Sequence, residues 1–425
     1  MSKELPQRSV TLFFFLAFAS IAIGIAQTSQ APISSSSAAV APAGSAAIGL
    51  EIMGLAEDPN GEPVNGAESH IRLSSNLLIV LNQPPPGDVS KYVLFINDDE
   101  VKGLDPPTST NYRSKPALLF KLKRVSANEA FWSQLLGSPS NEHIDVTVSL
   151  APLAGGDRST RIFGAAGASA FKFQVFSGFE LACAAAVILL VLIFVWGNAR
   201  YRTTLRDNLL PQLAPSRQPF SLGRCQMAFW FTLIFAAFVV LFFLLQDTNT
   251  ISSQALILMG ISGSTAAAAV AIDVAKNSPA DDANSALQAL GLNTYDDVQR
   301  VQQEILNRQQ ELDGLPPPPS QIPTTDQRRA QLQIEINDRN SILRTYYDKT
   351  LPFVSQGWFK DVTTDINGPT VHRLQVVFWT GTLGAIFLYF VYRNLAMPPF
   401  NATLLTLMGI SSGSYVGFKI QEVNN

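Results

Sequence analysis

The chain has 425 residues, of which 47% are hydrophobic and 15% are charged, and its formal net charge is −3. This charged fraction lies well below the roughly 25% that is typical of soluble domains. The apolar residues collect in a few long runs, which predicts a multi-pass membrane protein. The near-neutral charge argues against nucleic-acid binding, which needs a basic face. Cys183 and Cys225 lie in or beside apolar runs, so we expect no disulfide framework.

The N-terminus has the pattern of an export signal. Lys3 and Arg8 precede an apolar stretch that ends in small residues near Ala26. This pattern predicts a signal peptide over residues 1–26, either cleaved after about Ala26 or kept as an uncleaved signal anchor. Residues 27–47 are rich in Ser, Ala and Pro and predict a flexible leader.

Residues 48–175 predict an exported β domain. Turn residues separate short apolar runs that read as strands, at Leu77–Leu81, Tyr92–Ile96, Ala117–Leu122 and Ile144–Leu150. Several such strands in this length favour an antiparallel β-sandwich, immunoglobulin-like in type. The acidic turn at Asp98–Glu100 favours a solvated hairpin tip over a calcium site, because no ordered set of oxygen ligands is spaced around it.

Five apolar runs predict five transmembrane helices, at about 179–196, 226–245, 255–272, 374–392 and 402–418. Five arginines lie between the first two runs, whereas the loop 246–254 has no Lys or Arg. The positive-inside rule therefore places the arginine segment in the cytoplasm and the β domain on the outer side of the membrane. The predicted parts after the β domain are a first helix (176–198), a cytoplasmic linker (199–222), a hairpin (223–272), a cytoplasmic insert (273–371), a second hairpin (372–420) and a C-terminal tail (421–425).

The two predicted hairpins are an internal duplication. Residues 223–262 align without a gap with residues 372–411, at a constant offset of 149. An even number of crossings separates the copies, so we expect them to point the same way. The expected relation is a pseudo-two-fold axis along the membrane normal, as in parallel repeats.

Matched polar and aromatic residues mark the start of both copies: Arg224, Gln226 and Trp230 in the first, and Arg373, Gln375 and Trp379 in the second. Arg and Trp near a membrane surface are typical interface anchors. The alternative is a specific contact between the repeats, since Gln side chains hydrogen-bond between membrane helices.

The second helix of each hairpin carries small residues four apart. They are Gly409, Gly413 and Gly417 in the second copy, and Gly260, Ser264 and Ala268 in the first. A stripe of this kind lets helix backbones approach closely. We expect a tight seam inside one protomer, and the alternatives are a seam between protomers or a pore lined by the neighbouring serines.

The cytoplasmic insert predicts an antiparallel helical hairpin or short coiled coil. Val298, Val301, Ile305 and Leu312 recur at helical spacing before the helix-breaking run Pro316–Pro319, and a second helix is expected to begin near Thr325. The insert is interpreted as an intramolecular stalk, with a surface for a protein partner as the alternative.

The segments His372–Gln375 with Trp379, and Leu404–Gly413, resemble those of a group of uncharacterised bacterial multi-pass membrane proteins with a duplicated two-helix hairpin. The likeness covers about residues 200 to 425. It implies no activity, cofactor or catalytic residue.

Catalytic patterns are missing from the sequence. The three histidines lie in separate regions, and no HExxH, CxxC or P-loop motif occurs, while the one GxSxG match, Gly409–Gly413, lies inside a predicted transmembrane helix, so we expect no enzyme, metal site or cofactor. The expected function is an inner-membrane anchor or a coupler of signal or force between the β domain and the insert. Its expected partners are the lipid bilayer, a protein at the insert and further copies of the chain. The alternative is an oligomeric channel built from the glycine-rich helices.

Overall fold

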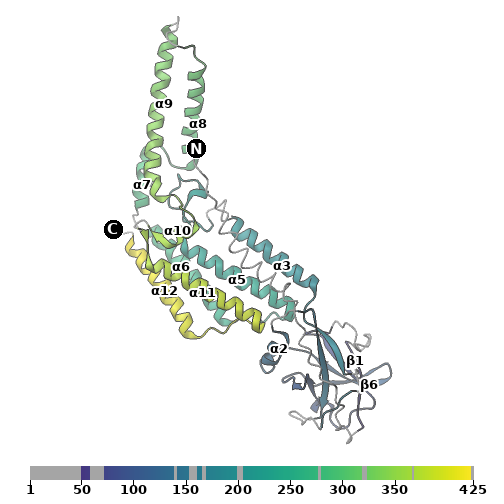
Figure 1. Cartoon of the computed structure of the whole chain (residues 1–425). Coiled ribbons are helices and arrows are strands. Elements are labelled where there is room, and N and C mark those ends of the chain that lie inside the picture. The colour runs from purple at the N-terminus through teal and green to yellow at the C-terminus, as the bar shows by residue number, and fades with distance from the viewer. Residues whose placement is uncertain are drawn as a thin grey trace, which may run out of the picture.

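A computed structural model describes nine stretches of the chain: residues 49–57, 71–137, 141–152, 160–164, 169–198, 204–275, 279–317, 323–365 and 368–422. Two small antiparallel sheets come first, followed by long apolar helices and a polar helical hairpin (Figure 1). The predicted signal peptide and leader lie outside the described residues and stay predictions.

The β domain consists of two four-stranded antiparallel sheets, ordered β1-β2-β6-β5 and β4-β3-β7-β8. Its strands and one helix, α2, are β1 Ile52–Ala56, β2 Asn76–Leu81, β3 Val93–Ile96, β4 Asp99–Glu100, β5 Thr108–Tyr112, β6 Lys115–Lys121, α2 Glu129–Leu136, β7 His143–Ala151 and β8 Ala170–Gln174. All four predicted strand runs are confirmed as β2, β3, β6 and β7. Alternate side chains from both sheets enter one buried core.

The acidic turn is a tight hairpin between β3 and β4. Asn97 and Asp98 both have positive φ, 49° and 70°, which suits a two-residue hairpin loop. Arg161 pairs with Asp98 at 3.2 Å and lies 3.9 Å above the ring of Phe95. Among the described residues, no group of His, Cys, Asp or Glu side chains is arranged to hold a metal ion.

Five long helices form a bundle: α3 Gly178–Leu192, continued by a π-helix Ile193–Gly197, then α5 Leu222–Leu245, α6 Ser253–Ala275, α11 Val371–Asn394 and α12 Ala402–Glu422. Four of them, α3 with its π-helix, α5, α6 and α11, are long and apolar enough to cross a membrane. The fifth predicted run does form a helix, α12, but its many Ser, Thr and Gly residues and Lys419 lower its mean hydropathy, and it is not among the four.

The duplication is reproduced helix by helix. The first residues of α5 and α11 are 149 positions apart, and so are their last residues. Both helices end at a residue in the left-handed conformation, Gln246 and Leu395, whose N–H donates to the carbonyl oxygen four residues earlier. The helices α6 and α12 then begin 149 positions apart. The α5–α6 hairpin is called repeat 1 below, and the α11–α12 hairpin repeat 2.

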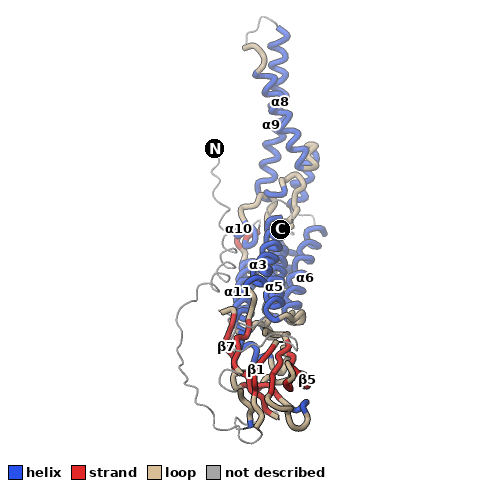
Figure 2. Tube along the Cα trace, turned by 90° about the vertical axis from the view of Figure 1, so that its right-hand side faces the viewer, coloured by secondary structure: helices blue, strands red, loops and turns tan. Residues whose placement is uncertain are grey.

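The polar insert is a stalk of α7 Pro279–Ala289, α8 Tyr295–Asp313 and α9 Pro323–Thr350, in which α8 and α9 lie side by side and antiparallel (Figure 2). Cross-helix ion pairs join Arg308 to Glu335 at 2.6 Å and Arg339 to Glu304 at 2.5 Å. The sequence prediction of a helical hairpin is confirmed here, although α9 starts two residues earlier than expected.

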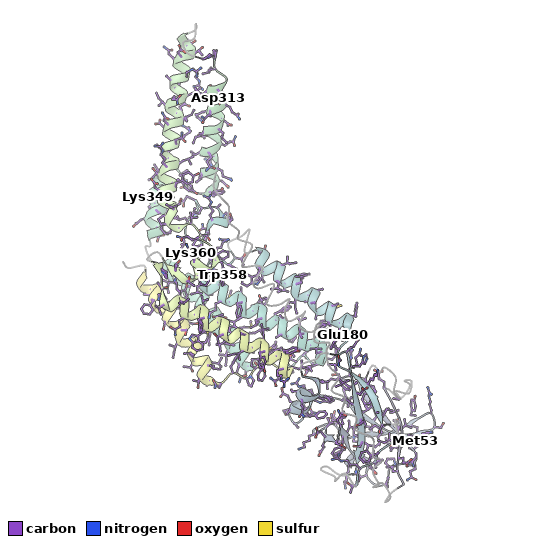
Figure 3. The ribbon with its side chains drawn as sticks, in the orientation of Figure 1. Met53, Glu180, Asp313, Lys349, Trp358 and Lys360 are labelled. Atoms are coloured by element: carbon purple, nitrogen blue, oxygen red, sulfur yellow. The ribbon has the colours of Figure 1, made fainter. Side chains whose placement is uncertain are left out.

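The β domain and the stalk lie at opposite ends of the bundle. Glu180 marks the end next to the β domain, whereas Trp358 and Lys360 mark the end next to the stalk, whose far part carries Asp313 (Figure 3). Between stalk and repeat 2 lie a short helix, α10 Trp358–Thr363, and a two-stranded ribbon of β9 Thr364–Asp365 and β10 Gly368–Pro369.

The stalk ion pairs predict that acid weakens the stalk. The hydrogen bond from Arg339 lowers the pKa of Glu304, and that from Arg308 lowers the pKa of Glu335. A lowered folded-state pKa stabilises the fold above the unfolded value of about 4.3, and the effect is lost as pH falls through the folded pKa. We expect the helical circular dichroism of the detergent-solubilised chain to melt earlier at about pH 3 than at about pH 7. The Glu304→Gln/Glu335→Gln variant should show a smaller pH difference, and an equal difference in both proteins would contradict this assignment.

Candidate functional site

The two repeats pack in a head-to-tail manner. The helix α5 packs against α11, and α6 packs against α12, while each hairpin also packs within itself. The four helices therefore form a square in which corresponding helices are neighbours. A two-fold axis along the bundle would instead put corresponding helices at opposite corners. The predicted pseudo-two-fold relation is wrong: repeat 1 uses one face and repeat 2 a different face, which is a heterologous contact.

Matched residues consequently have different surroundings. Trp230 is fully buried with its ring 6.3 Å from that of Phe387 in α11, whereas Trp379 is only half-buried. The ring of Phe229 packs on Gly384, but its counterpart Phe378 is 67% exposed. A heterologous contact explains the difference, because it buries a given face in one repeat only.

The matched glutamines also differ in their surroundings. The amide of Gln226 donates across the repeats to the Thr380 hydroxyl at 3.3 Å, and Gln226 is buried. Gln375 donates instead to Ser411 of its own hairpin at 3.1 Å. Of the two alternatives from the sequence, a contact between the repeats is observed for Gln226 and Trp230, but not for Gln375.

The matched arginines lie at the stalk end of the bundle and contact their own surroundings. Arg224 donates from Nη1 to the carbonyl oxygen of Arg206 at 2.7 Å. The guanidinium of Arg373 lies 5.4 Å from the centre of the Tyr415 ring. Each arginine is thus held by a contact inside the chain, and the two contacts differ in kind.

Among the described residues, the small-residue stripes form no seam inside the chain, so that expectation is wrong. A β-carbon added at Gly260, Gly409, Gly413 or Gly417 would meet no atom of the described chain within 4 Å. Ser264 is exposed and bonds back to the Ile261 carbonyl, and Ala268 is half-buried. The stripe points outward, because spacing alone does not say which side of a helix its neighbours occupy.

Other glycines make the close contacts. A β-carbon at Gly384 would collide with the Phe229 ring, and one at Gly223 would come within 3.0 Å of the Cα of Ala266. Gly223 thus brings α5 close to α6, and Gly384 brings α11 close to α5. Neither belongs to a recurring pattern, so the sequence offered no signal for them beyond their residue type.

We expect Gly384→Leu to separate the repeats. Overpacking of this kind costs about 1–3 kcal/mol. Gly381→Leu is the matched control, because Gly381 lies one turn earlier in α11 with no described neighbour within 4 Å of an added β-carbon. Thermal melting of both purified variants in detergent should show a lower midpoint for Gly384→Leu only. Equal midpoints would contradict the repeat interface.

The β domain holds the end of α11. Arg124 donates from Nη1 to the Leu395 carbonyl oxygen at 2.6 Å, and Ser133 of α2 donates to that of Asn394 at 2.8 Å. Gly137, just after α2, lies so close to the Arg393 carbonyl that only glycine fits. The last carbonyls of a helix lack partners within it, and cations are favourable there. Burial lowers the pKa of Arg124, and the nearby Glu129 opposes this shift.

A second contact joins the β domain to α3. Arg72 donates from Nη1 to both carboxylate oxygens of Glu180, at 2.7 and 2.8 Å. Glu180 lies in the first turn of α3, where a negative charge is favourable. The buried core is also continuous across this boundary, from Trp132 of the β domain to Met397 and Phe400 beside the bundle.

A compact collar joins the other end of the bundle to the stalk, built from residues 204–222, 351–365 and 368–370. Asp361 of α10 accepts hydrogen bonds at one oxygen from the Phe220 N–H at 3.0 Å and from Ser355, and at the other from the Gln356 N–H at 2.9 Å. The Tyr346 hydroxyl of α9 donates to the Gln212 carbonyl at 3.1 Å. The described part of the predicted linker, residues 204–222, is therefore a structured connection.

The guanidinium of Arg206 stabilises the collar from within. It lies 3.9 Å above the Phe220 ring and donates to the Gln218 carbonyl. Burial lowers its pKa, and the negative charge of Asp361 opposes the shift. The sequence signal for this contact was weak, because Arg206 was one of five arginines and was counted only for membrane orientation.

Comparison of the chain with protein-family models, with curated proteins and with solved structures finds no match.

Proposed function

We propose that this protein is a non-enzymatic membrane coupler that links the β domain to the stalk. The observation that carries the proposal is that α11 is held at both ends. Its last carbonyls accept from Arg124 and Ser133 of the β domain. Its start follows Thr370, whose N–H donates to the Thr363 carbonyl of the collar at 3.1 Å. The apolar helix α11 thus connects the β domain to the collar, and through the collar to the stalk.

In this proposal, a load or ligand on the β domain displaces α11 as a rigid body. Packed helices shift by sliding or hinging rather than by stretching, so movement at one end is transmitted to the other. The collar then tilts the stalk, because Asp361 ties α10 to the segment before α5. A partner protein that binds the stalk responds to this change in its position.

The membrane setting of the proposal is that of a bacterial inner membrane. The β domain, an immunoglobulin-like sandwich in this proposal, lies outside; the stalk, a short coiled coil, lies in the cytoplasm; and α12 is a fifth crossing. The four candidate spans and the placement of the two polar parts at opposite ends of the bundle support this reading. The resemblance of residues 200–425 to uncharacterised bacterial membrane proteins is consistent with it.

The coupling is tested by releasing α11 from the β domain. In nanodiscs, Arg124→Ala/Ser133→Ala leaves α11 carbonyls unpaired, which costs about 1–3 kcal/mol. We expect amide hydrogen exchange to rise near residues 389–400 and also in the collar at residues 355–370. The control is Lys121→Ala, whose side chain is exposed.

A rise confined to residues 389–400 would mean that the chain anchors the β domain without coupling it. A channel makes a different prediction: purified chain would pass ions across planar bilayers, and Gly413→Leu would alter that current. Such a current would overturn the coupler proposal.

A further inference from the structure

A groove of about 680 Å³ lies between α3, α5 and α6, in the half of the bundle next to the stalk. Its lining is mostly apolar and includes Phe194, Met227, Phe231, Met259, Ser262 and Gly263. All three helices are candidate membrane spans, so the groove would face the lipid chains if these helices cross a bilayer.

The duplication explains why the groove exists. The counterparts of Met227, Phe231, Met259 and Gly263 in repeat 2 are Val376, Thr380, Met408 and Ser412, all 8% exposed or less. Repeat 1 covers them: Gln226 contacts Thr380 and Met408, and Val376 shares a buried cluster with Leu222 and Cys225. The equivalent face of repeat 1 has no hairpin stacked on it in the described chain, and Met227 and Phe231 are 42% and 41% exposed.

The helix α3 lies on this face of repeat 1, in the place where a hairpin would stack, but it covers the face only partly. It packs against α5, so a second copy of the chain could not stack there without displacing it. The space that remains is too narrow for a helix pair but lies within the roughly 300–1,000 Å³ of small-molecule sites. Inside a bilayer, an apolar groove left empty would lose its van der Waals contacts. An acyl chain restores them.

The wall formed by α3 has an unusual backbone. Residues Ile193–Gly197 form a π-helix, and Phe194 and Val195 within it line the groove. The π-helix is rare, and single turns of it occur frequently at functional sites. This local change of helix type coincides with the groove.

A cation lies at the stalk end of the groove. Arg224 precedes Met227 by one turn, so it shares a face of α5 with Met227 and Phe231. Its guanidinium donates to the carbonyl oxygen of Arg206, next to Thr204 and Leu205, which line the groove. A guanidinium has five N–H donors and pairs well with phosphate oxygens.

We propose that the groove binds one phospholipid, with an acyl chain between α3, α5 and α6 and the phosphate of an anionic headgroup at Arg224. The proposal requires the bundle to lie in a membrane, but it does not depend on the coupler function. It also assigns to Arg224 a role that Arg373 does not share, because the guanidinium of Arg373 lies near the Tyr415 ring instead.

The test is to fill the groove. A β-carbon at Gly263 meets no described atom within 4 Å, so Gly263→Leu extends into the groove without a clash. Gly260→Leu is the matched control, one turn away on the outward stripe and equally open. Full-length chains are purified from membranes in mild detergent, and the phospholipid retained is measured by native mass spectrometry. We expect one lipid per wild-type chain, about fivefold to tenfold less in Gly263→Leu, and no change in Gly260→Leu.

A second measurement does not depend on whether the Gly263→Leu variant folds, because its main arm uses the wild-type chain. A phospholipid with a photoreactive acyl chain, added in nanodiscs, should cross-link to the peptides that contain Met227 and Met259. With Arg224→Gln, the preference for phosphatidylglycerol over phosphatidylcholine should fall. Unchanged lipid retention in Gly263→Leu, or cross-links confined to other helices, would overturn the proposal. So would a loss of chain dimers in Gly263→Leu without loss of lipid, which would assign the groove to a second copy.

Discussion

The need to satisfy the last carbonyl groups of α11 shapes the whole molecule. A helix leaves these groups without internal partners, and at this position the partners come from Arg124 and Ser133 of the β domain. This contact fixes where the sheets sit relative to the bundle. It also makes Gly137 necessary, because a side chain there would collide with the Arg393 carbonyl. With the collar holding the opposite end of α11, the β domain and the stalk are connected through one helix.

The duplication gave the bundle two copies of one hairpin, but the copies do not have equal roles. Head-to-tail packing buries one face of repeat 1 against the other face of repeat 2, which leaves each repeat with one unmatched face. Repeat 1 meets α3 there, and the incomplete fit creates the groove next to Phe231. Repeat 2 presents its unmatched face, with Phe378 and Tyr389, to its surroundings. The two copies thereby form one packed core and present two chemically distinct outer surfaces.

Much of the fold could be predicted from periodicity, and much of the site could not. Short apolar runs between turn residues, long apolar runs and the constant offset of 149 predicted the strands, the bundle helices and the repeat correctly, because these features depend on local residue order. The packing mode of the repeats depends on which helix faces meet. The sequence does not show this, because matched residues such as Trp230 and Trp379 are the same amino acid but have different surroundings. The junction residues were missed for a related reason: Ser133, Asp361 and Gly384 are ordinary in their own segments, and each contacts a partner far away in the chain.

The central claim is that one bundle holds the β domain and the stalk on opposite sides of a membrane. It is tested most directly by labelling single cysteines in intact cells with a membrane-impermeant thiol reagent, after Cys183 and Cys225 have been replaced by alanine. Lys102→Cys reports on the β domain and Gln309→Cys on the stalk, and both side chains are exposed. The account predicts labelling of Lys102→Cys in intact cells and of Gln309→Cys only after the membrane is permeabilised. Labelling of both positions in intact cells would contradict it.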